Sequence, residues 1–178
     1  MTLDFAATFF ASATLLLPIF ASERLQVDAR GYGFLAAAPA VGSVKTALIM
    51  ARAGSFSKQG RLVVVSVAIF GLATAAFGIS TVFWFSLLML AVTGAADTVS
   101  TVLRQTIRQL VTPNHLRGRM TSINMMFFMG GPQLGELEAG LLAAAIGAPL
   151  SVVIGGLGSI ASSAVAALKS KSLMDFEV

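Results

Sequence analysis

The sequence predicts an all-α, polytopic membrane protein with six transmembrane helices. Three observations predict it: apolar stretches recur along the 178 residues, basic residues fall on alternate connections, and only 11% of the residues are charged. A soluble domain carries about 25% charged residues. Each apolar stretch is close to the roughly 20 residues that cross a bilayer core of about 30 Å. Most of the apolar side chains must therefore face lipid.

The spans are expected in order along one bundle that comprises residues 1–178. Hydrophobicity places them at residues 3–20, 34–51, 62–80, 83–103, 120–146 and 149–168. The first stretch contains Asp4 and lacks the basic leader of a signal peptide, so we interpret it as a retained helix. Two three-helix units follow, 1–81 and 82–168, with a tail at 169–178. Because three is odd, the second unit begins on the opposite membrane face, as in the inverted repeats of many transporters.

The distribution of basic residues predicts the orientation. Nine of the twelve Lys and Arg residues fall on one side, namely Arg52, Lys58, Arg61, Arg104, Arg108, Arg117, Arg119, Lys169 and Lys171. The other side has only Arg24 and Arg30, next to Glu23 and Asp28. By the positive-inside rule, both termini lie in the cytoplasm. The net charge of +4 has the same origin, and no aromatic or Gly-rich pattern points to nucleic acid.

The composition excludes most catalytic chemistry. There is no cysteine and a single histidine, which rules out disulfides, thiol catalysis and metal sites built on cysteine or on several histidines. His115 lies in a basic loop without a nearby nucleophile or carboxylate. We expect neither an enzyme nor a metal or cofactor.

Charged residues inside predicted spans are the first site candidates, because ionisable groups at membrane depth are costly and usually functional. Lys45 precedes Arg52 by seven residues, and Asp97 precedes Arg104 by seven residues. Both therefore lie about 10 Å inside the cytoplasmic boundary. They are expected either to form an ion pair or, alternatively, to act separately, with Lys45 reaching the interface and Asp97 bonding to its neighbours.

A polar stripe surrounds Asp97 on its own helix. Thr93, Thr101 and Arg104 recur at spacings of three or four residues, which places them on one helix face. Such a face avoids lipid and is expected to line a substrate or proton pathway, or else to join helices through hydroxyl groups.

The fifth span carries Gln133, Glu136 and Glu138. Residues two apart point in different directions on a helix, which argues against a shared-proton carboxylate pair. Glu136 is aligned with Gln133, and we favour it as the cavity-facing group that exchanges protons. A structural role for one or both carboxylates is the alternative. Gly131, Pro132 and Gly135 nearby predict either a kink or a close-packing notch.

Several segments resemble a known family. They are Leu3 to Phe10, Arg52 to Arg61, Thr112 to Arg119 and Gln133 to Glu136. Together the segments resemble the C-terminal half of a major facilitator superfamily permease, in the bacterial exporter branch that includes enterobactin-exporter-like and multidrug permeases.

The resemblance implies proton-coupled export of a small amphiphilic molecule across the bacterial inner membrane, by alternating access. A missing N-terminal six-helix half or a second copy would complete the cavity, and Met125 to Phe128 would suit an amphiphilic substrate. The candidates for gating or ion pairing are Lys45, Asp4, Arg52, Arg61, Arg104, Arg117 and Arg119. The alternative is a membrane interaction module that does not transport, or an inactive transporter fragment.

Overall fold

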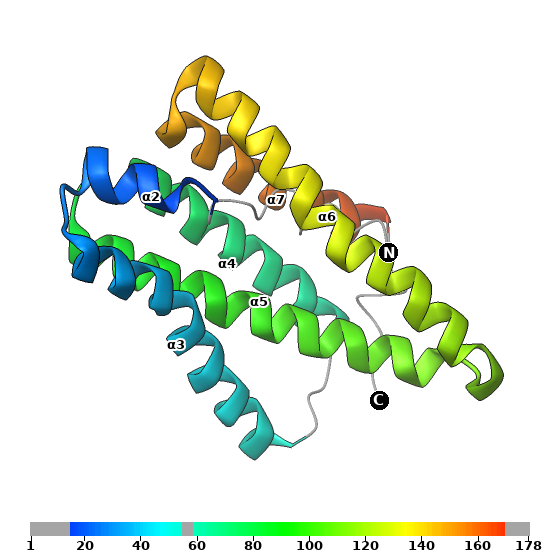
Figure 1. Ribbon diagram of the computed structural model, residues 1–178. Helices are drawn as coiled ribbons and strands as arrows, with labels where there is room; N and C mark the ends of the chain where they lie inside the picture. Colours follow the sequence, from blue (N-terminus) through cyan, green and yellow to red (C-terminus); the bar gives the residue numbers. More distant parts are fainter. Residues whose placement is uncertain (1–14, 55–58, 170–178) are drawn as a thin grey trace.

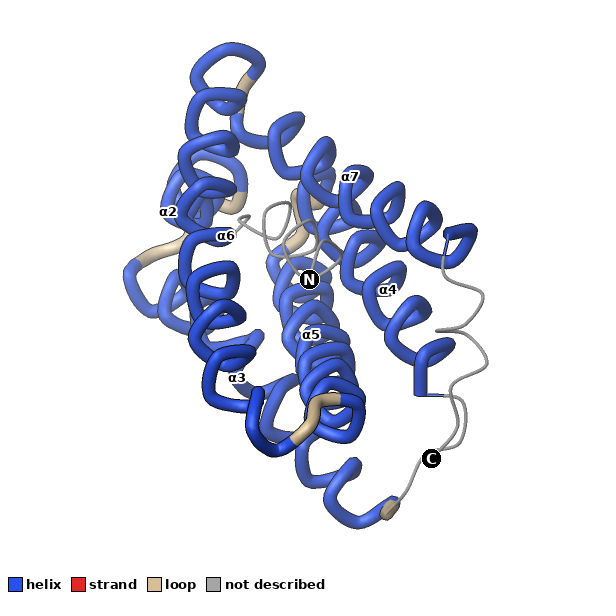
Figure 2. Tube along the Cα trace, turned by 90° about the vertical axis from the view of Figure 1, so that its right-hand side faces the viewer, coloured by secondary structure: helices blue, strands red, loops and turns tan. Residues whose placement is uncertain are grey.

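The computed structural model describes residues 15–54 and 59–169, and every regular element in those ranges is helical (Figures 1 and 2). The elements in order are α2 (Leu17–Ile19), the π-helical turn η2 (Phe20–Arg24), α3 (Ala29–Ala53), α4 (Gln59–Ile79), α5 (Phe83–Val111), the 3₁₀ turn η3 (Asn114–Leu116), α6 (Arg117–Ile146) and α7 (Ala148–Lys169). The prediction of an all-α fold is confirmed for these residues.

Local sequence determines where the helices begin and end. Asp28 caps α3, because its carboxylate accepts a hydrogen bond from the backbone N–H of Gly31 at 2.8 Å. Gly54 ends the same helix with a φ of +72°. Gly147, with a φ of +89°, separates α6 from α7. Such backbone conformations favour glycine, so each residue permits a chain reversal that other residues would resist.

Five predicted spans correspond to helices of the structure, although their boundaries differ. The first span lies mostly outside the described residues. Helix α3 begins five residues before its predicted span, and α5 continues eight residues past residue 103. Arg104 and Arg108 are therefore helical and do not lie in a loop. Hydropathy marks where a helix leaves the hydrocarbon, whereas backbone hydrogen bonds continue through polar residues at the interface.

Four helices are long and apolar enough to cross a membrane: α3, α4, α5 and α7. Helix α6 has 30 residues but is not among them. It contains Asn124, Pro132 and Gln133 together with two glutamates, which lower its mean hydropathy. The chain is thus a helical membrane protein, while the six-crossing topology and the two three-helix units stay predictions.

Helix α4 packs between α5 and α7, α5 also packs on α3, and α6 packs on α7 (Figures 1 and 2). Glycine permits the closest approaches. A Cβ added to Gly71 or to Gly156 would lie 2.6 Å from the carbonyl oxygen of the other residue, so the backbones of α4 and α7 touch. At the second crossing, a Cβ on Gly42 of α3 would overlap the carbonyl oxygen of Ala91, and one on Gly94 of α5 would overlap that of Pro39. Small residues are the usual means of helix contact in lipid.

The hydrophobic core gathers at one end of the bundle, where α2 and η2 meet the α4–α5 and α6–α7 turns. Phe20 and Phe77 are fully buried there, with ring centroids 4.7 Å apart. Leu35 of α3 and Leu90 of α5 belong to the same cluster. Asp97 lies outside this cluster, whereas Glu138 directly precedes Ala139, which belongs to it.

A serine adds a polar contact to the crossing of α3 and α5. The hydroxyl of Ser43 donates a hydrogen bond to the carbonyl oxygen of Gly94 at 3.0 Å. Replacing Ser43 by alanine is expected to lower the free energy of unfolding by about 0.6 kcal/mol, the average for such bonds between membrane helices. Unfolding in mixed detergent micelles measures it. Ser122, whose hydroxyl bonds only to its own helix at Gly118, is the control and should tolerate alanine. Equal losses would show that the contact between helices has no special role.

Candidate functional site

Polar residues of α5 are buried on both sides of Asp97. Ser86, Thr93 and Ser100 are buried, and each of the first two hydroxyls has a partner: Ser86 bonds to Ser80 at 2.8 Å, and Thr93 to the carbonyl oxygen of Leu90 at 2.7 Å. The Thr93 hydroxyl thus bonds to backbone of its own helix, and its place in a substrate or proton pathway stays a prediction. Asp97, in contrast, has an exposed side chain.

Asp97 lies in the middle of α5, 14 residues from Phe83 and 14 from Val111, or about 21 Å from either end. Its side chain is exposed in this chain. The carboxylate accepts a hydrogen bond from the Thr101 hydroxyl at 3.4 Å, and the positive charge of Arg104 acts on it. Carboxylates at this depth usually face the interior of a helix bundle or a water-filled cavity.

Arg104 lies one helical turn beyond Thr101 and is held in place by its own helix. Its Nε donates to the carbonyl oxygen of Ser100 at 3.2 Å, and one terminal nitrogen donates to the Thr101 hydroxyl at 3.4 Å. Thr101 thus lies between the carboxylate of Asp97 and the guanidinium of Arg104. We call Asp97, Thr101 and Arg104 the α5 charge cluster.

The structure does not bring Lys45 and Asp97 together as an ion pair. Lys45 is exposed on α3, and the charge that acts on Asp97 comes from Arg104. The reason is geometric: α3 and α5 touch near Gly42 and Gly94, and then α3 separates from α5 toward its C-terminal end (Figure 1). Equal depth along two helices does not make two residues neighbours when the helices diverge. Asp97 instead bonds to Thr101 of its own helix, and the roles of Lys45 and Asp97 stay predictions.

On α6, the small residues face inward. Gly131, Gly135 and Ala139 are buried, and the hydroxyl of Ser151 on α7 donates to the carbonyl oxygen of Ala139 at 2.8 Å. Helix α6 continues without a break through Pro132. The burial of Gly131 and Gly135 agrees with the packing interpretation, while the kink at Pro132 stays a prediction.

The two glutamates of α6 are both partly buried, and Gln133 is exposed. Glu138 follows Gly131 by seven residues and therefore lies on nearly the same side of the helix, whereas Glu136 points to its flank. The structure leaves their roles open, and the preference for Glu136 as the proton-exchanging group stays a prediction. Asp4, the remaining acidic candidate, lies outside the described residues.

The arginine candidates at the basic ends of the helices differ in their surroundings. Arg52 and Arg61, which flank the α3–α4 connection, are exposed. Arg117 folds back on α5, where Nε donates to the carbonyl oxygen of Thr112 at 3.4 Å and a terminal nitrogen donates to that of Gln109 at 3.3 Å. Arg117 thereby satisfies carbonyl groups at the C-terminal end of a helix, a common role for basic residues. Arg119 is exposed.

Two features escaped prediction. Asn124 of α6 accepts a hydrogen bond from Arg108 of α5 and so links two helices that otherwise pack little on each other. Gln59, at the start of α4, is 5% exposed, and its Oε1 has no hydrogen-bond partner within the part of the chain that the structure describes. An amide inside or beside an apolar span was the available signal for both residues. In the same ranges, no group of His, Cys, Asp or Glu side chains is placed to hold a metal ion.

The described helices define a helical membrane protein that carries charged and polar side chains at the middle of α5. Comparison with protein families agrees and is more specific, because the transmembrane secretion effector family of the major facilitator superfamily matches residues 2–177. The chain belongs to that family. It is therefore a multi-pass membrane protein of a transporter family, and this family is not one of enzymes.

Among curated proteins, the chain is similar to the enterobactin exporter EntS of Shigella flexneri, with 28% identity over 148 residues. The match covers 83% of this chain and 36% of the relative. The chain thus spans about a third of the length of that exporter. No solved structure matches the chain.

Proposed function

We propose that this chain acts as the C-terminal half of a permease that exports a small amphiphilic molecule in exchange for protons, by alternating access. The observation that carries the proposal is the exposed carboxylate of Asp97 in the middle of a membrane-spanning helix, with Thr101 and Arg104 beside it. A carboxylate that gains and loses a proton as the cavity opens to either side couples proton movement to transport. The family and the similarity to an exporter support the direction of transport.

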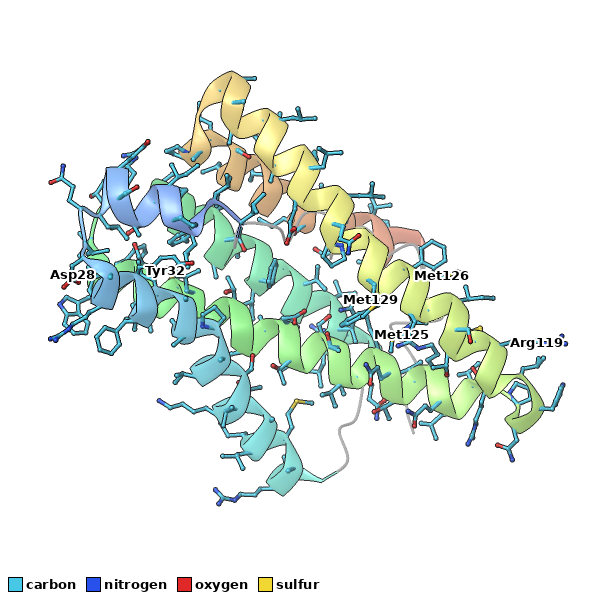
Figure 3. The ribbon with its side chains drawn as sticks, in the orientation of Figure 1. Asp28, Tyr32, Arg119, Met125, Met126 and Met129 are labelled. Carbon is cyan, nitrogen blue, oxygen red and sulfur yellow. The ribbon has the colours of Figure 1, made fainter. Side chains whose placement is uncertain are left out.

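The second half of the cavity comes from another six-helix bundle. A major reason is that the chain covers only 36% of the exporter it matches. A further N-terminal half or a second copy of this chain would cover Asp97 and the exposed apolar side chains of α6, among them Met125, Met126 and Met129 (Figure 3). We place the protein in a bacterial inner membrane with both termini in the cytoplasm, on the basis of the basic residues.

Efflux of a lipophilic dye from proteoliposomes tests the proposal. The chain is reconstituted alone, and a pH gradient is imposed with and without a protonophore. Efflux that follows the gradient and stops with the protonophore is the expected result for a self-sufficient, oligomeric transporter. If a folded and inserted chain gives no efflux, it does not transport alone. The second candidate, an interaction module that needs another bundle, would then be favoured by the partial coverage of the relative.

We expect different effects on efflux when the two glutamates of α6 are replaced, and the same assay measures both. Glu136→Gln is expected to abolish gradient-driven efflux, because the amide cannot carry a proton. Glu138→Gln, the matched control two residues away, should retain most of it. The same loss in both variants would contradict the assignment of proton exchange to Glu136, and retention in both would remove α6 from the proton pathway.

A further inference from the structure

All the charged residues in and around the connection between α5 and α6 are basic. Between Asp97 and Glu136 the sequence contains no acidic residue, but it contains His115 and four arginines, which are Arg104, Arg108, Arg117 and Arg119. All four cations are arginine, whereas the α3–α4 connection and the C-terminal tail also use lysine. Arginine binds phosphate groups through two parallel hydrogen bonds, which lysine cannot form. The charge of this segment therefore complements an anion that bears phosphate.

Helix lengths place this connection beyond the hydrocarbon. Helix α5 has 29 residues and α6 has 30, so each is about 44 Å long at 1.5 Å per residue. A bilayer core measures about 30 Å. The turn that joins them, residues 109–119, forms one extreme of the molecule (Figure 1). We call this turn the hairpin tip, and we expect it to lie at the depth of lipid headgroups.

Apolar side chains surround the cations at the hairpin tip. Leu110 is 54% exposed, Val111 63% and Leu116 38%. A turn that stood in water would not favour three large apolar groups on its surface, whereas the boundary between headgroups and acyl chains accepts apolar and cationic groups together. The tip therefore has the two chemical features of a phospholipid contact.

Hydrogen bonds hold the hairpin tip in shape. Arg117 bonds to the carbonyl oxygens of Gln109 and Thr112, and Arg108 bonds to Asn124 across the two helices. Arg119 is exposed, and its side chain points away from the helices (Figure 3). The arginines thus have different roles. Arg108 and Arg117 stabilise the turn, and the guanidinium of Arg119 faces the surroundings of the protein.

We propose that the hairpin tip binds the headgroup of an anionic phospholipid, with Arg119 as the principal phosphate ligand and Leu110, Val111 and Leu116 in contact with the acyl chains. This proposal does not rest on the proposed transport activity. It differs from the general attraction of basic loops to a negatively charged membrane surface, because one exposed arginine on a fixed turn carries most of the affinity.

Native mass spectrometry of the full chain, purified in detergent and titrated with phosphatidylglycerol or phosphatidylcholine, tests the proposal. Arg119→Gln is expected to weaken phosphatidylglycerol binding about tenfold, since a hydrogen bond to a charged group contributes about 1.5 kcal/mol. Arg52→Gln is the matched control, because Arg52 is also exposed and lies among basic residues on the same side. It should leave binding within about twofold, and phosphatidylcholine should not distinguish the three proteins.

Three outcomes would overturn the proposal. Equal weakening by Arg119→Gln and Arg52→Gln would show only general attraction of basic loops to anionic lipid. No weakening by Arg119→Gln would remove the principal ligand. Displacement of the lipid by inorganic phosphate at equal concentration would show an anion site without acyl-chain contacts. Thermal unfolding of both variants in detergent alone should match the wild type, because neither side chain supports the fold.

Discussion

Replacing Gly42 by alanine is expected to lower the free energy of unfolding by about 3 kcal/mol, at the upper end of the range for overpacking. The added methyl group would overlap the carbonyl oxygen of Ala91, which belongs to the backbone of α5 and cannot rotate away. Helices α3 and α5 must then separate, which also breaks the hydrogen bond from Ser43 to Gly94. Denaturation by sodium dodecyl sulfate in mixed micelles, followed by circular dichroism, measures the loss.

Gly33→Ala in the same helix is the control. A Cβ at Gly33 meets no atom within 4 Å, so the substitution should stabilise the helix by up to about 1 kcal/mol through its higher helix propensity. Gly94→Ala should destabilise as much as Gly42→Ala, and the double variant should lose less than the sum, because the first methyl group already opens the crossing that the second would enter. A neutral effect at Gly42 would mean that the two helices do not touch as described.

Asp97→Asn is expected to reduce gradient-driven dye efflux to the level of vesicles without protein. Asparagine preserves the size of the side chain and keeps an oxygen for the Thr101 hydroxyl, but it cannot bind and release a proton. The charge of Arg104 also loses its acidic neighbour. The folded structure should survive, because the Asp97 side chain is exposed and not part of the packed core.

Thr101→Val is the matched control, since it removes the hydroxyl group that bonds to Asp97 and leaves the carboxylate able to titrate. This variant should retain most of the efflux. Full activity of the asparagine variant would exclude Asp97 as the proton carrier. If Asp97→Asn and Thr101→Val are equally inactive, the geometry of the α5 charge cluster matters more than its ability to carry a proton.

Much of the helical architecture could be predicted from the sequence, because hydrophobic stretches of membrane length have few alternatives to a helix. The family was also predictable, since motifs such as Thr112 to Arg119 were sufficient to indicate it. Helix ends were less predictable. The extra turns of α5 that contain Arg104 and Arg108 are polar, and hydropathy does not register polar residues that continue a helix.

Contacts between helices were the least predictable part of the site. The seven-residue spacings placed Lys45 and Asp97 at one depth, but the crossing angle of α3 and α5 depends on where glycine lets the backbones touch. Thr101 and Arg104 were placed beside Asp97 correctly because all three belong to one helix, where spacing determines proximity. The hydrogen bond between Arg108 and Asn124 could not be predicted in this way, because the two residues lie on different helices and sequence spacing does not tell which residues of two helices meet.

Because α3 touches α5 most closely at Gly42, the part of α3 beyond Gly42 can move as a rigid arm about this crossing. Helix α3 extends 11 residues past Gly42 to Ala53, an arm of about 16 Å. Along this arm Val44, Leu48 and Ile49 are all exposed. A tilt of about 10° at the crossing would move the far end by about 3 Å, a displacement that follows from the same rise per residue. The tightest contact of α3 is thus also the point about which a small rotation would move the Ala53 end of the helix furthest.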